Sequence, residues 1–205
     1  DTLGSRGTAL GYSALANQNF TTATDNYNTG LGWNAGGAMT TGLFNTFVGG
    51  LAGDALTDAD ENVAVGQSSL TTDTKGSRNV AVGQIALATQ NFTTATNSYN
   101  TAVGYAGGGA ITTGINNTLV GALAGDALTD ADYNVALGES ALSTDTLGSR
   151  NVAIGRATLA NQNFTTATDS YNTGVGYGTG NAVTTGTRNT FVGALAGDAT
   201  DDGIL

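Results

Sequence analysis

The 205-residue chain contains no cysteine, no histidine and no proline. Without cysteine and histidine it has no Ser-His-Asp triad, no cysteine nucleophile and no ordinary zinc or iron site. Lysine and arginine number 6 against 16 aspartates and glutamates, and the net charge of −10 argues against binding to nucleic acid or anionic membranes. No apolar run approaches the roughly 20 residues of a membrane-spanning helix. We therefore expect no enzymatic activity, no catalytic residues, no cofactor, no metal and no membrane insertion.

The composition nevertheless favours a folded chain. Apolar residues make up 40% of it, which is enough for a core even with 32 glycines. Because residue 1 is aspartate and not methionine, we expect a fragment or a processed chain.

A long internal repeat organises the sequence. The segment Gln-Asn-Phe-Thr-Thr-Ala-Thr occurs at 18–24, 90–96 and 162–168, so the period is 72 residues. We predict a single domain, 1–205, made of three repeats at 1–72, 73–144 and 145–205, the last of which is incomplete.

A shorter unit lies within each long repeat. An asparagine recurs with spacings of 17 or 21 residues, and Gly7 takes the equivalent first place. A glycine follows four residues after each of these eleven positions. The asparagines, called here the Asn column, are Asn28, Asn45, Asn62, Asn79, Asn100, Asn117, Asn134, Asn151, Asn172 and Asn189. A period of 17 is too short for a helix pair, so we predict an all-β fold, a parallel β-solenoid of about eleven 17- or 21-residue coils.

The pattern inside a coil predicts its packing. In Asn79-Val80-Ala81-Val82-Gly83, alternation places Val80 and Val82 on one face, which we expect to point into the coil. We expect the Asn column to form a hydrogen-bonded ladder at a corner and the glycines to adopt positive φ at a tight bend. Eight residues after the Asn position, a coil carries either leucine or glycine, and the glycine coils place an apolar residue three positions later. Each coil thus supplies about one large group from that side to a close-packed interior.

The middle residue of each short strand is then expected to face outward. This position is small or apolar throughout, whereas a solvated face would carry charged or hydroxyl side chains. We therefore predict an oligomer interface, with three-fold symmetry preferred, unless a bulge reverses the faces. The predicted interface residues are Phe47, Ala64, Ala81, Ala102, Leu119, Ala136, Ala153 and Phe191, with Gly30 and Gly174 in the same column.

Two segments resemble known families. The segment Gly-Ser-Arg-Asn-Val-Ala-Val-Gly-Gln-Ile-Ala at 76–86 resembles the head repeat of YadA-like trimeric autotransporter adhesins. The segment Asn-Thr-Ala-Val-Gly-Tyr at 100–105 resembles repeats of tail-fibre-like proteins of phages and bacteria. The resemblance implies a left-handed parallel β-roll, assembled as a trimer, in an extracellular fibre on a cell surface or virion. The coils here are longer than those of the adhesin heads.

The four extra residues of each 21-residue coil form a polar loop with one aromatic residue. Such loops, presented periodically on a rigid scaffold, suit multivalent contacts with a glycan or protein of a host surface. The alternative is that the phenylalanine packs inward. The candidate ligand-binding residues are Asn19, Phe20, Thr21, Asn91, Phe92, Thr93, Asn163, Phe164 and Thr165.

For two further patterns we prefer a structural role to ligand binding. Acidic residues cluster at Asp54, Asp58, Asp60 and Glu61, at Asp126, Asp130 and Asp132, and at Asp198, Asp201 and Asp202. Their spacing matches no known calcium loop, so we favour a solvated corner that keeps neighbouring solenoids apart. A threonine column at Thr40, Thr57, Thr74, Thr112, Thr129, Thr146 and Thr184 suggests ice binding, but it breaks at the 21-residue coils and is more typical of a turn.

The sequence thus predicts a structural fibre or adhesin head segment that acts as a rigid extracellular spacer and contacts a host surface. The alternatives are the receptor-binding region of a phage tail fibre and a self-assembling extracellular filament subunit.

Overall fold

The computed structural model describes residues 1–199, which form an all-β structure without helices. Contacts divide the chain into two compact units, Asp1–Tyr99 and Asn100–Leu205. The described chain is a parallel β-solenoid of about eleven turns, five in the first unit and six in the second, which confirms the predicted fold class. No helix among the described residues is suited to crossing a membrane.

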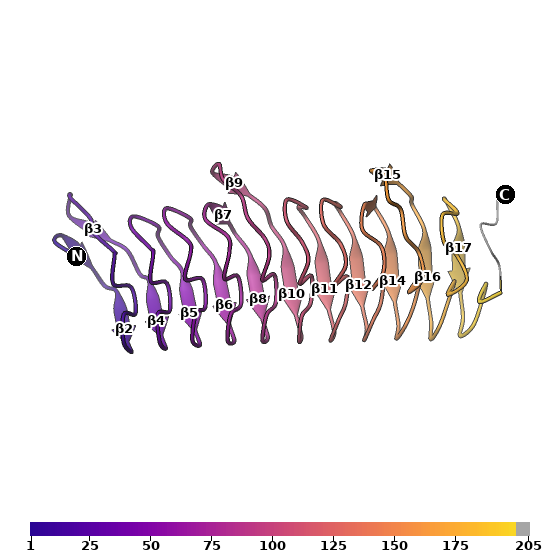
Figure 1. The fold of residues 1–205 in the computed structure, drawn as a ribbon, viewed down its shortest axis with the longest axis horizontal. Helices are drawn as coiled ribbons and strands as arrows, with labels where there is room; N and C mark the ends of the chain where they lie inside the picture. The colour runs from indigo at the N-terminus through magenta and orange to yellow at the C-terminus, as the bar shows by residue number, and fades with distance from the viewer. Residues whose placement is uncertain (200–205) are drawn as a thin grey trace. The chain divides into compact units, whose positions relative to one another are not determined.

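In the first unit, one short strand per coil lines up in a parallel sheet in the order β8-β6-β5-β4-β2. Successive strands pair in register, for example Gly30 with Phe47 and Phe47 with Ala64. Two-residue strands form separate parallel pairs, β1 with β3 and β7 with β9, at the loops of the 21-residue coils (Figure 1). The strands are β1 (Gly4–Ser5), β2 (Thr8–Leu10), β3 (Thr24–Asp25), β4 (Thr29–Leu31), β5 (Thr46–Val48), β6 (Val63–Val65), β7 (Gly76–Ser77), β8 (Val80–Val82) and β9 (Thr96–Asn97).

The second unit repeats this arrangement. Its parallel sheet has the order β17-β16-β14-β12-β11-β10, and β13 pairs with β15 at its one long loop. The strands are β10 (Thr101–Val103), β11 (Thr118–Val120), β12 (Val135–Leu137), β13 (Gly148–Ser149), β14 (Val152–Ile154), β15 (Thr168–Asp169), β16 (Thr173–Val175) and β17 (Thr190–Val192).

A buried asparagine ladder joins the coils, as predicted. The backbone N–H groups of Asn45 and Asn62 donate to Oδ1 of the asparagine one coil earlier, at 2.8 and 2.9 Å. The Nδ2 group of Asn62 also donates to the Gly76 carbonyl at 3.0 Å. The ladder residues of the second unit follow the same pattern, with N–H to Oδ1 distances of 2.8 to 3.1 Å. Each amide therefore satisfies buried groups of two coils, and this makes the stacking register specific.

The glycine that ends each strand makes the bend that the sequence predicts. All eleven have φ between 122° and 140°, a region that residues with a side chain rarely adopt. A Cβ on Gly49 would also lie 2.6 Å from the carbonyl oxygen of Gly66 on the next coil. The glycine is thus required by the backbone angle and by the close approach of the coils.

The predicted faces of the strand are wrong. Val80 and Val82 are partly exposed, whereas Ala81 between them is fully buried. The physical reason is that the ladder asparagine points into the coil, so alternation puts the residue two positions later inside as well. The predicted interface residues therefore belong to the interior in the described structure: Phe47, Ala64, Ala81, Ala102, Leu119, Ala136 and Ala153 are fully buried, and Phe191 is half-buried.

The interior is filled by compensating sizes from its two walls. The ring of Phe47 lies against Gly36 and Gly53, where a Cβ would approach its carbons to 2.6 and 2.5 Å. Every coil with leucine on the opposite wall has alanine in the middle of its strand, as Leu70 does with Ala64. In three coils both positions are small, as in the coil of Gly30 and Gly36. The glycine coils also bury the apolar residue predicted three positions later: Met39, Leu56, Ile111, Leu128 and Val183. The predicted exchange between leucine and glycine is thus confirmed, and the middle of the strand takes part in it.

Replacing a ladder asparagine tests how much the ladder stabilises the fold. In Asn62→Ala, the Asn79 N–H loses its acceptor and the Gly76 carbonyl loses a donor. Since each buried group left unsatisfied costs about 1–3 kcal/mol, the free energy of unfolding should fall by about 2–4 kcal/mol. Urea unfolding followed by circular dichroism measures this. Asn97→Ala, at an exposed position of strand β9, is the matched control and should change it by less than about 0.5 kcal/mol. Equal effects of the two changes would contradict the role of the ladder.

Candidate functional site

The outward side of the strands is the main candidate interaction surface. The first and third residues of each strand point outward, and none of them is charged. We call these two columns the sheet face of each unit. In the first unit they are Thr8, Thr29, Thr46, Val63 and Val80 with Leu10, Leu31, Val48, Val65 and Val82; in the second, Thr101, Thr118, Val135, Val152, Thr173 and Thr190 with Val103, Val120, Leu137, Ile154, Val175 and Val192. All of them are half-buried or exposed, so an uncharged and mostly β-branched surface faces solvent.

A ladder of arginine and aromatic side chains borders the sheet face. It consists of the residue before each Asn-column position, and φ at this residue lies between 51° and 65° in all eleven coils. In the first unit, Arg6 lies over the Tyr27 ring at 5.4 Å, and this ring stacks on Phe44 with a centroid distance of 5.6 Å. The ladder residues are Arg6, Tyr27, Phe44, Glu61, Arg78 and Tyr99, and in the second unit Asn116, Tyr133, Arg150, Tyr171 and Arg188.

The arginines of this ladder are held by several partners at once. In the second unit, Arg150 lies between the rings of Tyr133 and Tyr171, at 4.8 and 5.8 Å, and its Nε donates to Asp169 at 2.9 Å. Hydrogen bonding to Asp169 raises the pKa of Arg150 further above its ordinary value. Arg78 makes the equivalent contacts to Glu61 and Tyr99 in the first unit. Four of the six cationic residues lie in this one column, which the sequence analysis did not single out.

The phenylalanines proposed as ligand-reading residues are buried. Phe20, Phe92 and Phe164 are only 5%, 7% and 6% exposed. The cause is a buried carboxylate: Asp73 Oδ1 accepts from the N–H groups of Gly76 and Phe92, both at 3.0 Å, and Oδ2 accepts from the Gln90 amide at 2.5 Å. Asp1 and Asp145 make the same bonds in the other copies. The alternative reading, in which the ring packs inward, is therefore the correct one.

The remaining loop residues face solvent. Asn19, Thr21, Asn91, Thr93 and Thr165 are exposed, and Asn163 is half-buried. The side-chain oxygens of Asn91 and Asn163 already accept hydrogen bonds from Thr74 and Thr146, at 3.2 and 3.1 Å. The loops thus keep exposed threonines at their tips but present no aromatic ring.

The threonine column proposed for ice binding uses its hydroxyls within the coil stack. Thr40 Oγ1 donates to the Thr57 carbonyl, and Thr57 Oγ1 donates to the Thr74 carbonyl, both at 3.1 Å. In the second unit, Thr112 and Thr129 do the same at 3.2 and 3.0 Å. These hydroxyls stabilise a corner, as the turn interpretation expects.

The acidic corners also have local partners. Asp60 Oδ1 accepts from the Leu43 N–H, and Asp132 Oδ1 from the Ile115 N–H, both at 2.8 Å. Within residues 1–199, no three acidic groups gather closely enough to hold a metal ion, while Asp201 and Asp202 lie outside the described part.

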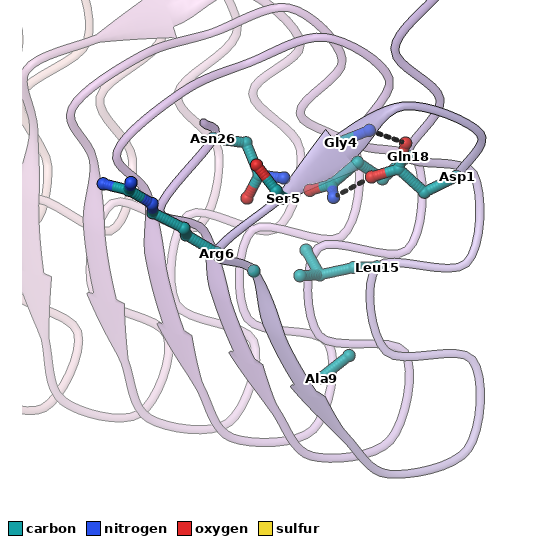
Figure 2. Close-up of a pocket in the computed structure, with 9 residues that line it drawn as sticks. Asp1, Gly4, Ser5, Arg6, Ala9, Leu15, Gln18 and Asn26 are labelled. Atoms are coloured by element: carbon teal, nitrogen blue, oxygen red, sulfur yellow. Dashed lines mark hydrogen bonds between the residues drawn. The ribbon is translucent and has the colours of Figure 1, made fainter. Parts of the chain in front are cut away.

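The described structure has a cavity of about 260 Å³ inside the first coil (Figure 2). Gly7 occupies an Asn-column position here, so this coil has no ladder oxygen to accept from the Asn28 N–H. Asn26 Oδ1 accepts from this N–H instead, at 2.9 Å. Asn26 Nδ2 lines the cavity without a partner. Strand β2 pairs with β4, so the cavity lies beside the edge strand of the described parallel sheet.

Neither a protein-family model, nor a curated protein, nor a solved structure matches this chain. The candidate surfaces are therefore judged on their own geometry and chemistry.

Phe92→Ala separates a structural role of the loop ring from a binding role. Because the Phe92 ring is buried, its removal should lower the free energy of unfolding by about 3–5 kcal/mol. Urea unfolding measures this, with Thr94→Ala at the exposed loop tip as the control. An unchanged unfolding midpoint for Phe92→Ala would show that the ring is not part of the core.

Asp126→Asn tests the one buried carboxylate oxygen without a partner among the described residues. The equivalent Asp54 accepts from Thr71 at 2.6 Å and from Asn34 at 3.4 Å, whereas no hydrogen bond reaches Asp126 Oδ1. Burial accordingly raises the pKa of Asp126 above its ordinary value of 3.8, although a backbone hydrogen bond opposes this.

A raised pKa means that the folded state disfavours the charged form, so this group destabilises the protein at neutral pH. Asp126→Asn should therefore raise the free energy of unfolding at pH 7, by about 0.5–1 kcal/mol because solvent still reaches the side chain. The gain should shrink as the pH falls through the raised pKa towards 3.8. Thermal unfolding at several pH values measures it. Asp54→Asn is the matched control and should give no gain; a pH-independent effect of Asp126→Asn would contradict the explanation.

Proposed function

We propose that this chain is a rigid structural segment of an extracellular fibre or adhesin head, and that it associates with further copies of itself. The observation that carries the proposal is the uncharged sheet face. Parallel sheets in proteins are normally covered on both sides, and here the coil covers only the inner side. An outward surface made of threonine, valine, leucine and isoleucine fits an interface better than a solvated wall.

The composition and border of the sheet face support a second copy as its occupant. Five coils spaced by ~4.8 Å and a three-residue strand of ~10 Å give about 240 Å² in the first unit, and the six coils of the second give about 290 Å². Each area is below the roughly 800 Å² per partner of a standard interface, so the bordering ladder has to contribute to the contact as well. The bordering ladder contributes tyrosine and arginine, which are the side chains enriched at such interfaces. The resemblance to adhesin heads makes three copies the preferred number.

The internal bonding supports the mechanical part of the proposal. Ladder amides, strand pairs and buried side chains connect every coil to the next within each unit, so bending a unit requires breaking buried hydrogen bonds. The absence of proline leaves every backbone N–H available for such bonds. These properties suit a spacer that holds its surface groups at fixed intervals, and we propose no catalytic role.

Light scattering tests the proposal. The wild-type chain should show a stable mass of several chains, three being preferred, at all concentrations studied. The double variant Val65→Lys with Val82→Lys places two cations on adjacent coils of the sheet face and should give the mass of one chain, because an unpaired buried charge strongly disfavours an interface.

The control for this experiment is Thr94→Lys at an exposed loop tip, which adds a charge away from the sheet face and should leave the mass unchanged. Circular dichroism checks that all variants keep the β-fold. A wild-type protein with the mass of one chain would overturn the self-association.

A further inference from the structure

A second column of exposed side chains lies beyond the glycine bend, away from the sheet face. It consists of the residue after each bend glycine, and we call it the corner column. Its coils stack as closely as the strands do, since the Leu51 N–H donates to the Trp33 carbonyl at 2.9 Å and the Ser68 N–H to the Gly50 carbonyl at 3.0 Å. The column is Tyr12, Trp33, Gly50, Gln67 and Gln84 in the first unit, and Tyr105, Ala122, Glu139, Arg156, Tyr177 and Ala194 in the second.

The column is interrupted directly after Trp33. The indole is 57% exposed, and Gly50 on the next coil has no side chain. A Cβ built on Gly50 would meet only the Trp33 carbonyl oxygen, at 3.9 Å, so the space above it is open. On the following coil, the Gln67 side chain is fixed by a 2.7 Å hydrogen bond from the amide of Gln84. Trp33, Gly50 and Gln67 therefore form the two walls and the floor of a notch.

The width of this notch suits one ring. Coils repeat at ~4.8 Å, so the side chains of Trp33 and Gln67 are separated by about 9.6 Å along the stack. A ring centred between them lies at ~4.8 Å from each, within the range over which ring stacking is favourable. One flanking side chain is an exposed indole, and the other is a neutral amide. The Gln67 amide accepts from Gln84 and donates to Ser68 Oγ at 3.1 Å, which leaves one N–H and one oxygen lone pair for a ligand.

The second unit repeats the arrangement. Tyr105 is 52% exposed and is followed on the next coil by Ala122, then by Glu139. Glu139 is held by Arg156 at 2.7 Å, as Gln67 is held by Gln84. Tyr177, 53% exposed, is likewise followed by Ala194. An aromatic wall above a small residue thus recurs at the 72-residue period, which gives the same element three times.

We propose that the Trp33 notch binds a pyranose ring of a saccharide. The C–H groups on one face of the sugar carry a weak positive charge and pack on the indole, while its hydroxyls exchange hydrogen bonds with the Gln67 amide. The three notch residues carry no charge, so a neutral ring fits better than an ion. The proposal adds a ligand to the structural role and does not depend on self-association.

Trp33 is the only tryptophan, so its fluorescence reports on the notch directly. Titrating the full chain with tetrasaccharides of glucose and of N-acetylglucosamine should change the emission of Trp33 with a Kd on the order of 1 mM for at least one of them. The absence of any saturable change for either sugar up to about ten times that concentration would overturn the proposal.

Two variants separate binding in the notch from other effects. Gly50→Val fills the floor without strain, because the space is open and Gly50 does not have a positive φ. It should abolish the fluorescence response while circular dichroism stays unchanged. The matched control, Ala122→Val, fills the corresponding position of the second unit and should leave the Trp33 response intact.

A response retained in Gly50→Val would overturn the proposal, because the sugar would then lie elsewhere. A third outcome identifies a different occupant. If Trp33 emission shifts with protein concentration in the absence of sugar, and Gly50→Val lowers the mass seen by light scattering, a ring from a second copy fills the notch and the saccharide proposal is wrong. The test of the sheet face with Val65→Lys and Val82→Lys is independent of this outcome.

Discussion

The asparagine ladder is the interaction on which the rest of the structure depends. A primary amide has a donor and an acceptor on the same planar group, so one side chain can bond the coil before it and the coil after it at once. Here Oδ1 of Asn45 accepts from the Asn62 N–H of the coil after it at 2.9 Å, while its Nδ2 donates to Asn28 Oδ1 of the coil before it at 3.2 Å and to the Ala59 carbonyl at 2.8 Å. The hydrogen bonds of this buried row also fix the register of every other column. The sheet face, the arginine and aromatic ladder and the corner column are aligned because the amides allow one stacking register.

The solenoid could be predicted because each of its constraints recurs as a residue type. The bend of each coil needs a positive φ and therefore has glycine, and the buried amide row has asparagine in nearly every coil. The spacing of these two residue types shows the coil period in the sequence alone. The phase of the strand could not be obtained from alternation alone, since a three-residue strand alternates equally well in either phase. A further signal was present. Phe47 accompanies Gly53, and every coil with leucine on the opposite wall, such as Leu70, has alanine in the middle of its strand. Two large side chains thus never face each other, as expected when both columns fill one interior.

The candidate sites were less predictable than the fold, for a reason visible in the long loops. Composition alone marks Phe92 as an exposed aromatic in a polar segment, yet Asp73 on the preceding coil turns it inward with a bond to its own N–H. That contact joins residues far apart in the sequence, and a reading of the loop by itself misses it. The notch at Trp33 is formed by residues on three successive coils, so it becomes visible only when the sequence is aligned by coil. The sheet face could be found once the phase was known, because its outward residues form two uncharged columns.

The asparagine ladder also restricts how such a chain can change its length. A residue inserted between Asn45 and Asn62 outside a loop would move every later side chain out of line with its neighbours. The long coils show where growth is tolerated. Their four extra residues lie between Phe92, whose N–H donates to Asp73, and the next ladder residue, Asn100, in a loop that projects from the stack (Figure 1). Otherwise length changes by whole coils. Within one unit, two groups at equivalent positions of their coils are therefore separated along the stack by a whole number of coil spacings of ~4.8 Å.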